Sequence, residues 1–281
     1  MGIVNVTPDS FSDGDPGMTP ARALATCERL VRDGAHILDL GGESSRPGAE
    51  PVPLEIELAR VVPVLRGAVT LGVPVSIDSA KPEVMRAALD LGCDIVNDIG
   101  ALRAPGALEA VAAHPTCGVV LMHMRGVPRS MQAGEPDYAD VVAEVRDFLA
   151  ERTRAAEGAG VGRERIVVDA GIGFGKTPAH NLSLLARQRE LVDGSLPPLL
   201  AGWSRKSTLV QLAGLKGVPR GQRTAEQQAT IDAASVAAAV LAVERGARIV
   251  RVHAVAATRA ALALLAAATL SRPAGEGESR R

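Results

Sequence analysis

The chain has 281 residues, of which 47% are apolar, and this is enough for a large buried core in one domain. Its 31 basic and 32 acidic residues are interleaved and only 2% of residues are aromatic, so neither a basic stripe nor a stacking platform for nucleic acid is indicated. Nucleic acid is therefore excluded as a partner. No apolar run approaches the ~18 residues that a membrane helix needs, so we expect no membrane partner.

The three cysteines, Cys27, Cys93 and Cys117, lie far apart in apolar surroundings. This spacing suggests neither a disulfide framework nor a zinc site, so we expect reduced core residues. The first residues also lack a basic region followed by an apolar stretch. These features predict a cytoplasmic protein.

Short apolar runs recur along the chain, and each contains or ends on a polar residue. Several follow a glycine that stops a helix and a short turn, as in Gly34–Asp39, Gly72–Asp78, Gly92–Asn97 and Gly246–Arg251. Between the runs, apolar residues recur at helical spacing. Strands are predicted near 3–6, 36–40, 74–78, 94–98, 118–123, 165–169, 198–202 and 248–253.

Eight strands that alternate with helices favour a closed parallel barrel over an open doubly wound sheet, the alternative, because continuously apolar strands imply helices that cover the sheet. The predicted fold class is α/β, a (β/α)8 TIM barrel, in a single domain over residues 1–271. Residues 272–281 lack the apolar side chains that would order them and are expected to form a disordered tail. In such barrels the active site lies at the carboxyl ends of the strands.

The loops after the first two strands are unusual. Asn5–Gly14 gathers hydroxyls and acids around Phe11, an aromatic residue that a solvated turn would not need. In Gly41–Gly48, paired glycines let backbone amides approach an anion, and Ser45 and Arg46 add a donor and a fixed positive charge. The alternatives are an ordinary long loop and a plain glycine-rich turn.

Three later strands contribute Asp78, Asn97 and Asp169. Buried carboxylates need partners, so this set predicts a ligand rich in N–H donors. A purely structural network, in which an aspartate pairs with Lys206 or Arg251, is the alternative.

The segment Gly171–Thr177 invites comparison with a nucleotide-phosphate loop. Ala170 stands where that motif requires glycine, and Pro178 follows at once, so the motif is rejected. The segment is instead predicted to bend at the rim, which leaves Asp169 accessible and puts Phe174 over a pocket.

Ser204–Ser207 follows the seventh strand, and Arg251 and His253 close the eighth. Strand alternation points Arg251 and His253 to the same side, and the loops after strands seven and eight often bind phosphate in barrels. We therefore predict a phosphorylated or pyrophosphorylated substrate. The alternative is a solvated helix start beside a histidine of the core.

The cysteines, histidines and carboxylates show no spacing typical of a zinc site. A Mg²⁺ ion held mostly by substrate phosphates and by one protein oxygen, such as that of Asn5, fits the preferences of that ion.

Taken in order, these motifs resemble those of the dihydropteroate synthase family, from residue 2 to about 270. The resemblance implies a (β/α)8 barrel that joins a dihydropterin methyl diphosphate to 4-aminobenzoate, releases pyrophosphate and forms dihydropteroate for folate synthesis. It also implies a homodimer formed through the late helices, and inhibition by sulfonamides. The motifs that carry it are Asn5–Gly14, Gly41–Gly48, Ser76–Asp78, Asn97–Ile99, Met122–Gly126, Asp169–Lys176, Ser204–Ser207 and Arg251–His253.

The resemblance also implies a role for each matching residue. The pterin would contact Asp78, Asn97, Ile99, Met122, Asp169, Phe174, Lys206 and Arg251. The diphosphate would contact Asn5, Arg251 and His253, with Mg²⁺ on Asn5. The aminobenzoate would contact Phe11, Ser45, Arg46, Pro47 and Ser204. Catalysis would rest on Asp78, Lys206, Arg251 and His253, which act by positioning and electrostatics.

The chain departs from the family pattern at three positions. Ser45 stands where threonine is usual, Ala170 where proline is usual and Ala254 where aspartate is common, so His253 is expected to lack an orienting carboxylate beside it. Two other functions stay open. A pterin-dependent methyltransferase barrel would not need the pyrophosphate-binding residues, whereas a non-catalytic pterin-binding paralogue is consistent with Ala254.

Overall fold

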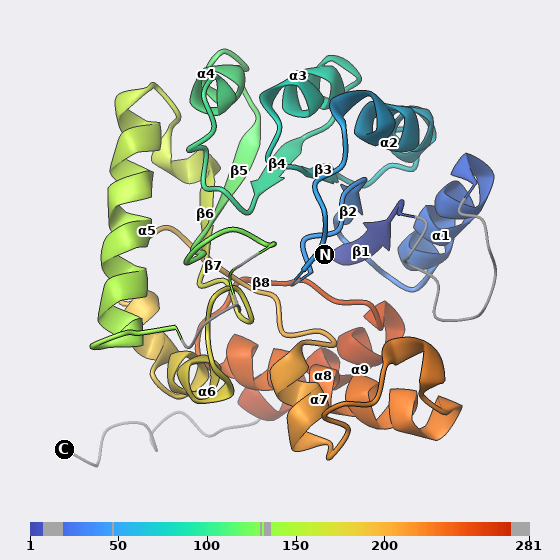
Figure 1. The fold of residues 1–281 in the computed structure, drawn as a ribbon, viewed down its shortest axis with the longest axis vertical. Coiled ribbons are helices and arrows are strands. Elements are labelled where there is room, and N and C mark those ends of the chain that lie inside the picture. Colours follow the sequence, from blue (N-terminus) through green and yellow to red (C-terminus); the bar gives the residue numbers. More distant parts are fainter. Residues whose placement is uncertain (8–18, 47, 130, 132–135, 271–281) are drawn as a thin grey trace.

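The computed structural model describes residues 1–7, 19–46, 48–129, 131 and 136–270. In these residues eight parallel strands curl around a common axis, with helices on the outside (Figure 1). The strands are β1 (Gly2–Asn5), β2 (Leu38–Gly41), β3 (Val75–Asp78), β4 (Ile95–Asp98), β5 (Gly118–Met122), β6 (Ile166–Asp169), β7 (Leu199–Ala201) and β8 (Ile249–Val250). They pair in chain order, which confirms the predicted TIM barrel and excludes an open doubly wound sheet.

The last strand is shorter than predicted, because only two residues after position 248 pair as a regular strand. The chain nevertheless closes the barrel just beyond it. Gly2 forms an isolated parallel bridge with Val252, whose N–H donates to the Met1 carbonyl at 2.9 Å. The Val252 carbonyl in turn accepts from Ile3 at 3.0 Å. The first and last strands are thereby joined.

The helices lie between the strands, where apolar residues recur at helical spacing, and α1 (Pro20–Arg32) and α6 (Pro178–Ala186) begin at threonine caps. Thr19 accepts from the N–H of Arg22 at 3.3 Å, and Thr177 accepts from that of His180 at 3.2 Å. In the described part of the chain, no helix combines the length and the hydrophobicity that a membrane span requires. The helices are α1 (Pro20–Arg32), α2 (Leu54–Ala68), α3 (Pro82–Asp90), α4 (Ala107–Ala112), α5 (Val141–Gly158), α6 (Pro178–Ala186), α7 (Ser207–Leu212), α8 (Ala225–Glu244) and α9 (Val255–Leu270), with short 3₁₀ turns η2 (Arg163–Arg165), η3 (Gln188–Leu191) and η4 (Arg220–Gln222).

Strand alternation divides the barrel into an outer core and an inner column. Leu38 and Leu40 of β2 are fully buried in the large core beneath the helices, so Asp39 between them points into the barrel. The inner column begins with an apolar floor, which is formed by Met1, Ile37, Ile95, Val120, Val167, Leu200 and Ile249. Two residues further along their strands, the same inward face carries the polar groups Asp39, Asn97, Asp169 and Arg251. The alternation thus places the polar layer directly above an apolar floor.

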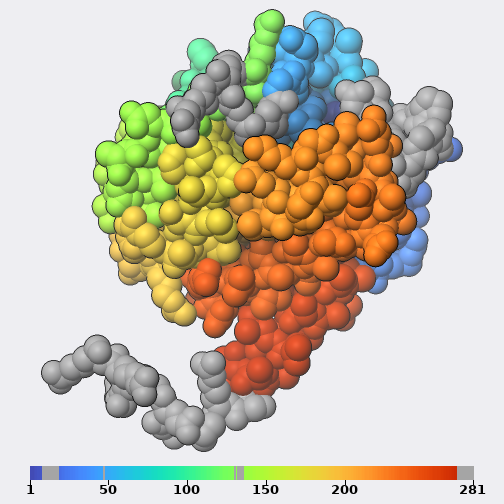
Figure 2. Space-filling view, turned by 60° about the horizontal axis from the view of Figure 1, so that its bottom comes forward, coloured from blue at the N-terminus to red at the C-terminus, as the bar shows by residue number. Residues whose placement is uncertain are grey.

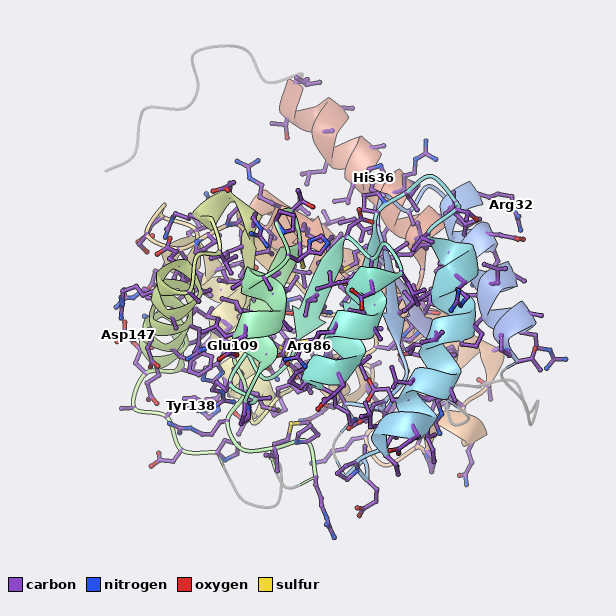
Figure 3. The ribbon with its side chains drawn as sticks, turned by 90° about the horizontal axis from the view of Figure 1, so that it is seen from above. Arg32, His36, Arg86, Glu109, Tyr138 and Asp147 are labelled. Atoms are coloured by element: carbon purple, nitrogen blue, oxygen red, sulfur yellow. The ribbon has the colours of Figure 1, made fainter. Side chains whose placement is uncertain are left out.

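The loops before the strands and the loops after them lie at opposite ends of the barrel. In the side view of the barrel, His36, which precedes β2, and Tyr138, which lies between β5 and α5, are at opposite ends (Figure 3). Tyr138 donates to the Gly175 carbonyl at 2.9 Å and so packs at the carboxyl end. The three cysteines are free and buried, as predicted.

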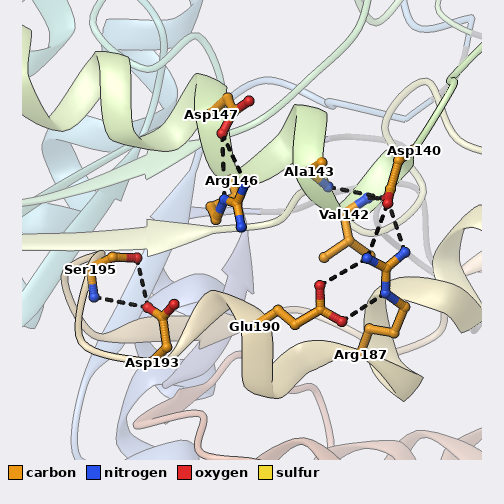
Figure 4. Close-up of polar contacts among 9 residues, drawn as sticks. All are labelled: Asp140, Val142, Ala143, Arg146, Asp147, Arg187, Glu190, Asp193 and Ser195. Atoms are coloured by element: carbon orange, nitrogen blue, oxygen red, sulfur yellow. Dashed lines mark hydrogen bonds and ion pairs between the residues drawn. The ribbon is translucent and has the colours of Figure 1, made fainter.

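An exposed ion-pair cluster connects the start of α5 to the end of α6. Arg187 donates to both carboxylate oxygens of Asp140 at 3.0 Å and also to Glu190 (Figure 4). Asp140 is at the same time the N-cap of α5, where it accepts from Val142. Because these pairs are exposed, they contribute little to stability.

Candidate active site

A cavity of about 440 Å³ opens at the carboxyl ends of the strands. Phe11 and Pro47, which were predicted at its aminobenzoate end, lie outside the described residues. Every other residue of the predicted site lines the cavity: Asn5, Ser45, Arg46, Asp78, Asn97, Ile99, Met122, Asp169, Phe174, Ser204, Lys206, Arg251 and His253. The fold therefore brings these residues together, while their individual roles stay predictions.

A buried network of charges stands at the base of the cavity. The Nε atom of Arg251 donates to Asp39 at 2.6 Å, and its Nη2 atom donates to Asp78 at 2.6 Å. The Asn97 amide donates to Asp39 at 3.3 Å. Pairing of Asp78 with Arg251 belongs to the structural network considered above, yet both residues also line the cavity. These groups can therefore hold one another in place and present charge to a ligand.

Burial gives the members of this network different titration behaviour. It raises the pKa of Asp78 to about 7, although Arg251 acts in the opposite direction. Burial also opposes the charge of Arg251, but Asp39 and Asp78 outweigh it and raise the Arg251 pKa. Arg251 is thus a permanent cation, whereas Asp78 changes its charge near neutral pH.

Asp169 and Lys206 also line the cavity, beside the ring of Phe174. Burial raises the pKa of Asp169 and lowers that of Lys206 to about 8, and the charge of each partly offsets the effect of burial on the other. The Lys206 ammonium lies 4.1 Å from the ring centroid of Phe174. Phe174 packs with Met122 and Met131. An apolar wall beside a charged edge suits a flat heterocycle that carries N–H and carbonyl groups.

The bend after β6 is held by Lys176, which sequence reasoning did not single out. Its buried ammonium donates to the carbonyls of Gly171 and Phe174 at 3.0 and 3.2 Å and contacts Nδ1 of His123 at 2.8 Å. Burial lowers the pKa of Lys176 to about 7. Gly171 has a φ of 67°, and a Cβ there would collide with the His123 carbonyl, so only glycine fits this turn. The rejection of a nucleotide-phosphate loop is consistent with this geometry, because the lysine serves its own backbone.

His253 finds an orienting partner that the sequence did not indicate. Ser204 Oγ and His253 Nδ1 lie 2.8 Å apart, and the same hydroxyl accepts from the His253 N–H at 3.2 Å. Ser204 therefore holds the imidazole where Ala254 cannot. Burial lowers the pKa of His253 well below its usual value, and Arg205 and Arg251 lower it further. The imidazole is therefore neutral at pH 7 and is available as a hydrogen-bonding group.

Three further basic residues were not singled out from the sequence, and two of them, Arg220 and Arg223, line the cavity. Lys81 joins the loop after β2 to α2, because its ammonium bonds Glu43 of that loop and Glu57 of α2, the latter at 2.6 Å. Arg220 and Arg223 line the cavity from the connection between α7 and α8. No periodicity could have signalled Arg220 and Arg223, since they lie in a helix connection and not at the strand ends from which the site was predicted.

The side chains that could bind a metal ion are relevant to the predicted Mg²⁺ site. Among the described residues, no group of three or more His, Cys, Asp or Glu side chains could hold a metal ion. Asn5 lines the cavity at the end of β1, and its side chain makes no hydrogen bond with the described residues. Its amide oxygen is thus available, which fits Mg²⁺ carried mainly by substrate phosphates and water.

The two shifted pKa values predict a narrow pH optimum. If Asp78 acts as a carboxylate and Lys206 as an ammonium, kcat/KM should rise as the pH passes about 7 and fall as it passes about 8. Initial rates at limiting concentrations of the expected substrate, the pterin diphosphate, would measure both limbs across this pH range. In the variant Lys206→Met, the fall of kcat/KM at alkaline pH should disappear. If that fall remains, it is not caused by deprotonation of Lys206.

Comparison with known proteins identifies the family of this chain. The pterin binding enzyme family matches residues 1–253. Dihydropteroate synthase of Neisseria meningitidis serogroup C is 47% identical over 265 residues, which cover 93% of this chain and 89% of that protein. The Xanthomonas albilineans dihydropteroate synthase structure with 4-aminobenzoic acid has 48% identity and a TM-score of 0.85, covering 96% of this chain and 93% of that one. The Burkholderia cenocepacia enzyme complexed with 7,8-dihydropteroate has 50% identity and a TM-score of 0.82, covering 96% and 90%. This chain belongs to the dihydropteroate synthase family of pterin-binding enzymes.

Proposed function

We propose that this protein is a dihydropteroate synthase, a transferase that condenses 6-hydroxymethyl-7,8-dihydropterin diphosphate with 4-aminobenzoate. The products are 7,8-dihydropteroate and pyrophosphate. One observation carries the proposal. The same cavity is lined by Asp169, by Lys206 against the ring of Phe174, and by the charged Arg251. Asp169, Lys206 and the aromatic ring suit a pterin, whereas the positive charge of Arg251 suits a diphosphate.

The proposed pterin contacts follow from hydrogen-bonding capacity. Asp169 is a buried carboxylate that accepts only from the Gly171 N–H, at 2.7 Å, among the described residues. It can therefore accept N–H groups of the pterin, while Lys206 donates to the ring carbonyl. Asn97, Ile99 and Met122 would complete the pocket around the ring.

The diphosphate would lie beside Arg251, His253 and Asn5. The reaction breaks the bond between the pterin methylene carbon and the diphosphate oxygen, and the electron pair leaves with pyrophosphate. The Arg251 guanidinium and a hydrogen bond from neutral His253 stabilise that growing charge. Asp78, as a carboxylate, stabilises the positive charge that spreads from the methylene carbon into the pterin.

The arylamine nitrogen then attacks the methylene carbon and loses a proton to solvent. Its conjugate acid is weak, so no strong general base is needed, and catalysis is mainly positioning. Ser45 and Arg46 of the loop after β2, together with Ser204, would frame the aminobenzoate. Sulfonamides are expected to compete for this end of the cavity.

Mg²⁺ is proposed as the cofactor, held by the Asn5 amide oxygen and the substrate. When bound, the ion would neutralise diphosphate oxygens and improve the leaving group. We expect Asn5→Ala to raise the Mg²⁺ concentration for half-maximal rate by about tenfold or more. A Mg²⁺ titration at saturating substrates measures this change, and a superimposable titration curve would remove Asn5 from the metal site.

We also propose a cytoplasmic homodimer whose functional unit is one barrel domain, residues 1–271. The three free, buried cysteines fit a reducing compartment. Figure 2 shows the late segments of the chain, coloured orange to red, next to one another on one face, and α8 contacts both α7 and α9. Leu212 of α7 and Leu264 of α9 are 62% and 73% exposed, and such apolar side chains favour a contact between copies.

The decisive experiment measures pyrophosphate release when the protein is incubated with the pterin diphosphate, 4-aminobenzoate and Mg²⁺. We expect release that depends on the arylamine, with one dihydropteroate formed per pyrophosphate. Pterin binding without turnover would instead indicate a non-catalytic paralogue. Methyl transfer in place of pyrophosphate release would indicate a methyltransferase barrel.

A further inference from the structure

Arginine side chains gather at the rim of the cavity, but their charges are not equally compensated. Arg205 makes two bonds to Asp232, at 2.7 and 2.8 Å, which neutralise it. Arg223 donates to the Val218 carbonyl at 3.3 Å. Arg220, in the same connection between α7 and α8, lines the cavity as well.

The guanidinium of Arg220 is not fully hydrogen-bonded by the described residues. Its Nε atom is buried without a hydrogen-bond acceptor, and within the described residues its guanidinium forms no ion pair. Burial lowers the pKa of Arg220 to about 10, and Arg46, Arg205 and Arg223 lower it further. A buried donor without an acceptor, surrounded by like charges, is costly unless a ligand supplies the acceptor. That ligand group must be an anion.

The reaction offers two anions, and position favours one of them. The proposed diphosphate residues, Arg251, His253 and Asn5, stand at the ends of β8 and β1 above the barrel floor. Arg220 instead comes from a helix connection. The charge that acts on it most strongly is that of Arg46, in the loop after β2 that is proposed to frame the aminobenzoate. In 4-aminobenzoate the carboxylate is para to the amine, so it points away from the pterin carbon that the amine attacks. It should therefore face the rim.

We propose that Arg220 binds the carboxylate of the arylamine substrate and thereby makes the enzyme prefer an anionic arylamine over a neutral one. This inference rests on the proposed function, because it assigns a residue to one of its substrates. A guanidinium fork matches the two oxygens of a carboxylate better than a point charge does. Arg220 is thus a specificity-determining residue that binds far from the reacting atoms.

The test compares 4-aminobenzoate with its neutral analogue 4-aminobenzamide in steady-state assays. For Arg220→Gln, we expect the KM for 4-aminobenzoate to rise about 10- to 100-fold, the loss that one charge-assisted contact implies. The KM for 4-aminobenzamide, the KM for pterin diphosphate and kcat should stay close to the wild-type values. Arg220→Lys, which keeps the charge but not the fork, should recover part of the preference.

Lys216→Gln is the matched control, since it removes one positive charge from the same connection at an exposed position. It should leave the preference for the anionic arylamine unchanged. An equal loss for both arylamines, a rise in KM for the diphosphate instead, or no change would each overturn the role of Arg220. If Arg220→Gln does not fold, Arg220→Lys decides by the same comparison. A wild-type protein that releases no pyrophosphate would refute the proposed function, whereas an active wild type with an indifferent Arg220 refutes this inference alone.

Discussion

Replacing Arg251 with alanine is expected to lower kcat/KM at least ~10²-fold, a loss typical of a missing electrostatic donor at a site of developing charge. The guanidinium is proposed to stabilise the departing pyrophosphate, and no other described side chain at the base of the cavity is a permanent cation beside Asp78. Steady-state rates of pyrophosphate release at saturating 4-aminobenzoate measure the effect. An activity within a few fold of the parent would remove Arg251 from catalysis.

The same substitution should also destabilise the fold, and a double variant separates the two effects. Removing Arg251 leaves Asp39, which is fully buried, without its cation, and a broken buried pair costs about 3–5 kcal/mol. Adding Asp39→Asn removes that uncompensated charge, so thermal stability should partly recover. Activity should not recover with it. Joint recovery of stability and activity would mean that Arg251 acts only through the fold.

Replacing Asp169 with asparagine is expected to weaken pterin binding about 10²-fold, because two charge-assisted hydrogen bonds to the ring would be lost or weakened. The amide keeps nearly the same shape and its oxygen can still accept from Gly171, so the bend after β6 should survive. Calorimetric titration with an unreactive pterin measures the affinity, and the KM for 4-aminobenzoate should stay unchanged. A rise confined to that KM would contradict a pterin role.

Asp98→Asn is the matched control for this experiment. Asp98 also ends a strand and is buried, and burial raises its pKa, but its carboxylate accepts from the N–H groups of Gly100 and Leu102. It does not line the cavity. We therefore expect the control to lose stability and to keep its pterin affinity. Equal losses of affinity in both variants would show that charge removal acts through the fold.

The sequence by itself determined the barrel and the position of its active site. Glycine stops followed by short apolar runs repeat along the chain, and parallel strands joined by helices pair in chain order, so a local pattern was enough to predict the topology. Alternation along β8 similarly fixed Arg251 and His253 on one face, and both line the cavity. The length of β8 was wrong, because apolar composition cannot show where the hydrogen-bonded ladder stops.

Only the tertiary structure decided which of these residues contact one another. Arg251 lies 212 positions from Asp39 and 173 from Asp78, and no local period encodes a contact across such distances. Burial, which also depends on the assembled fold, makes His253 neutral and leaves the Nε atom of Arg220 without an acceptor among the described residues. Charge state and pairing are properties of the packed environment, because desolvation and neighbouring charges set them, whereas strand order follows from patterns that each segment carries alone.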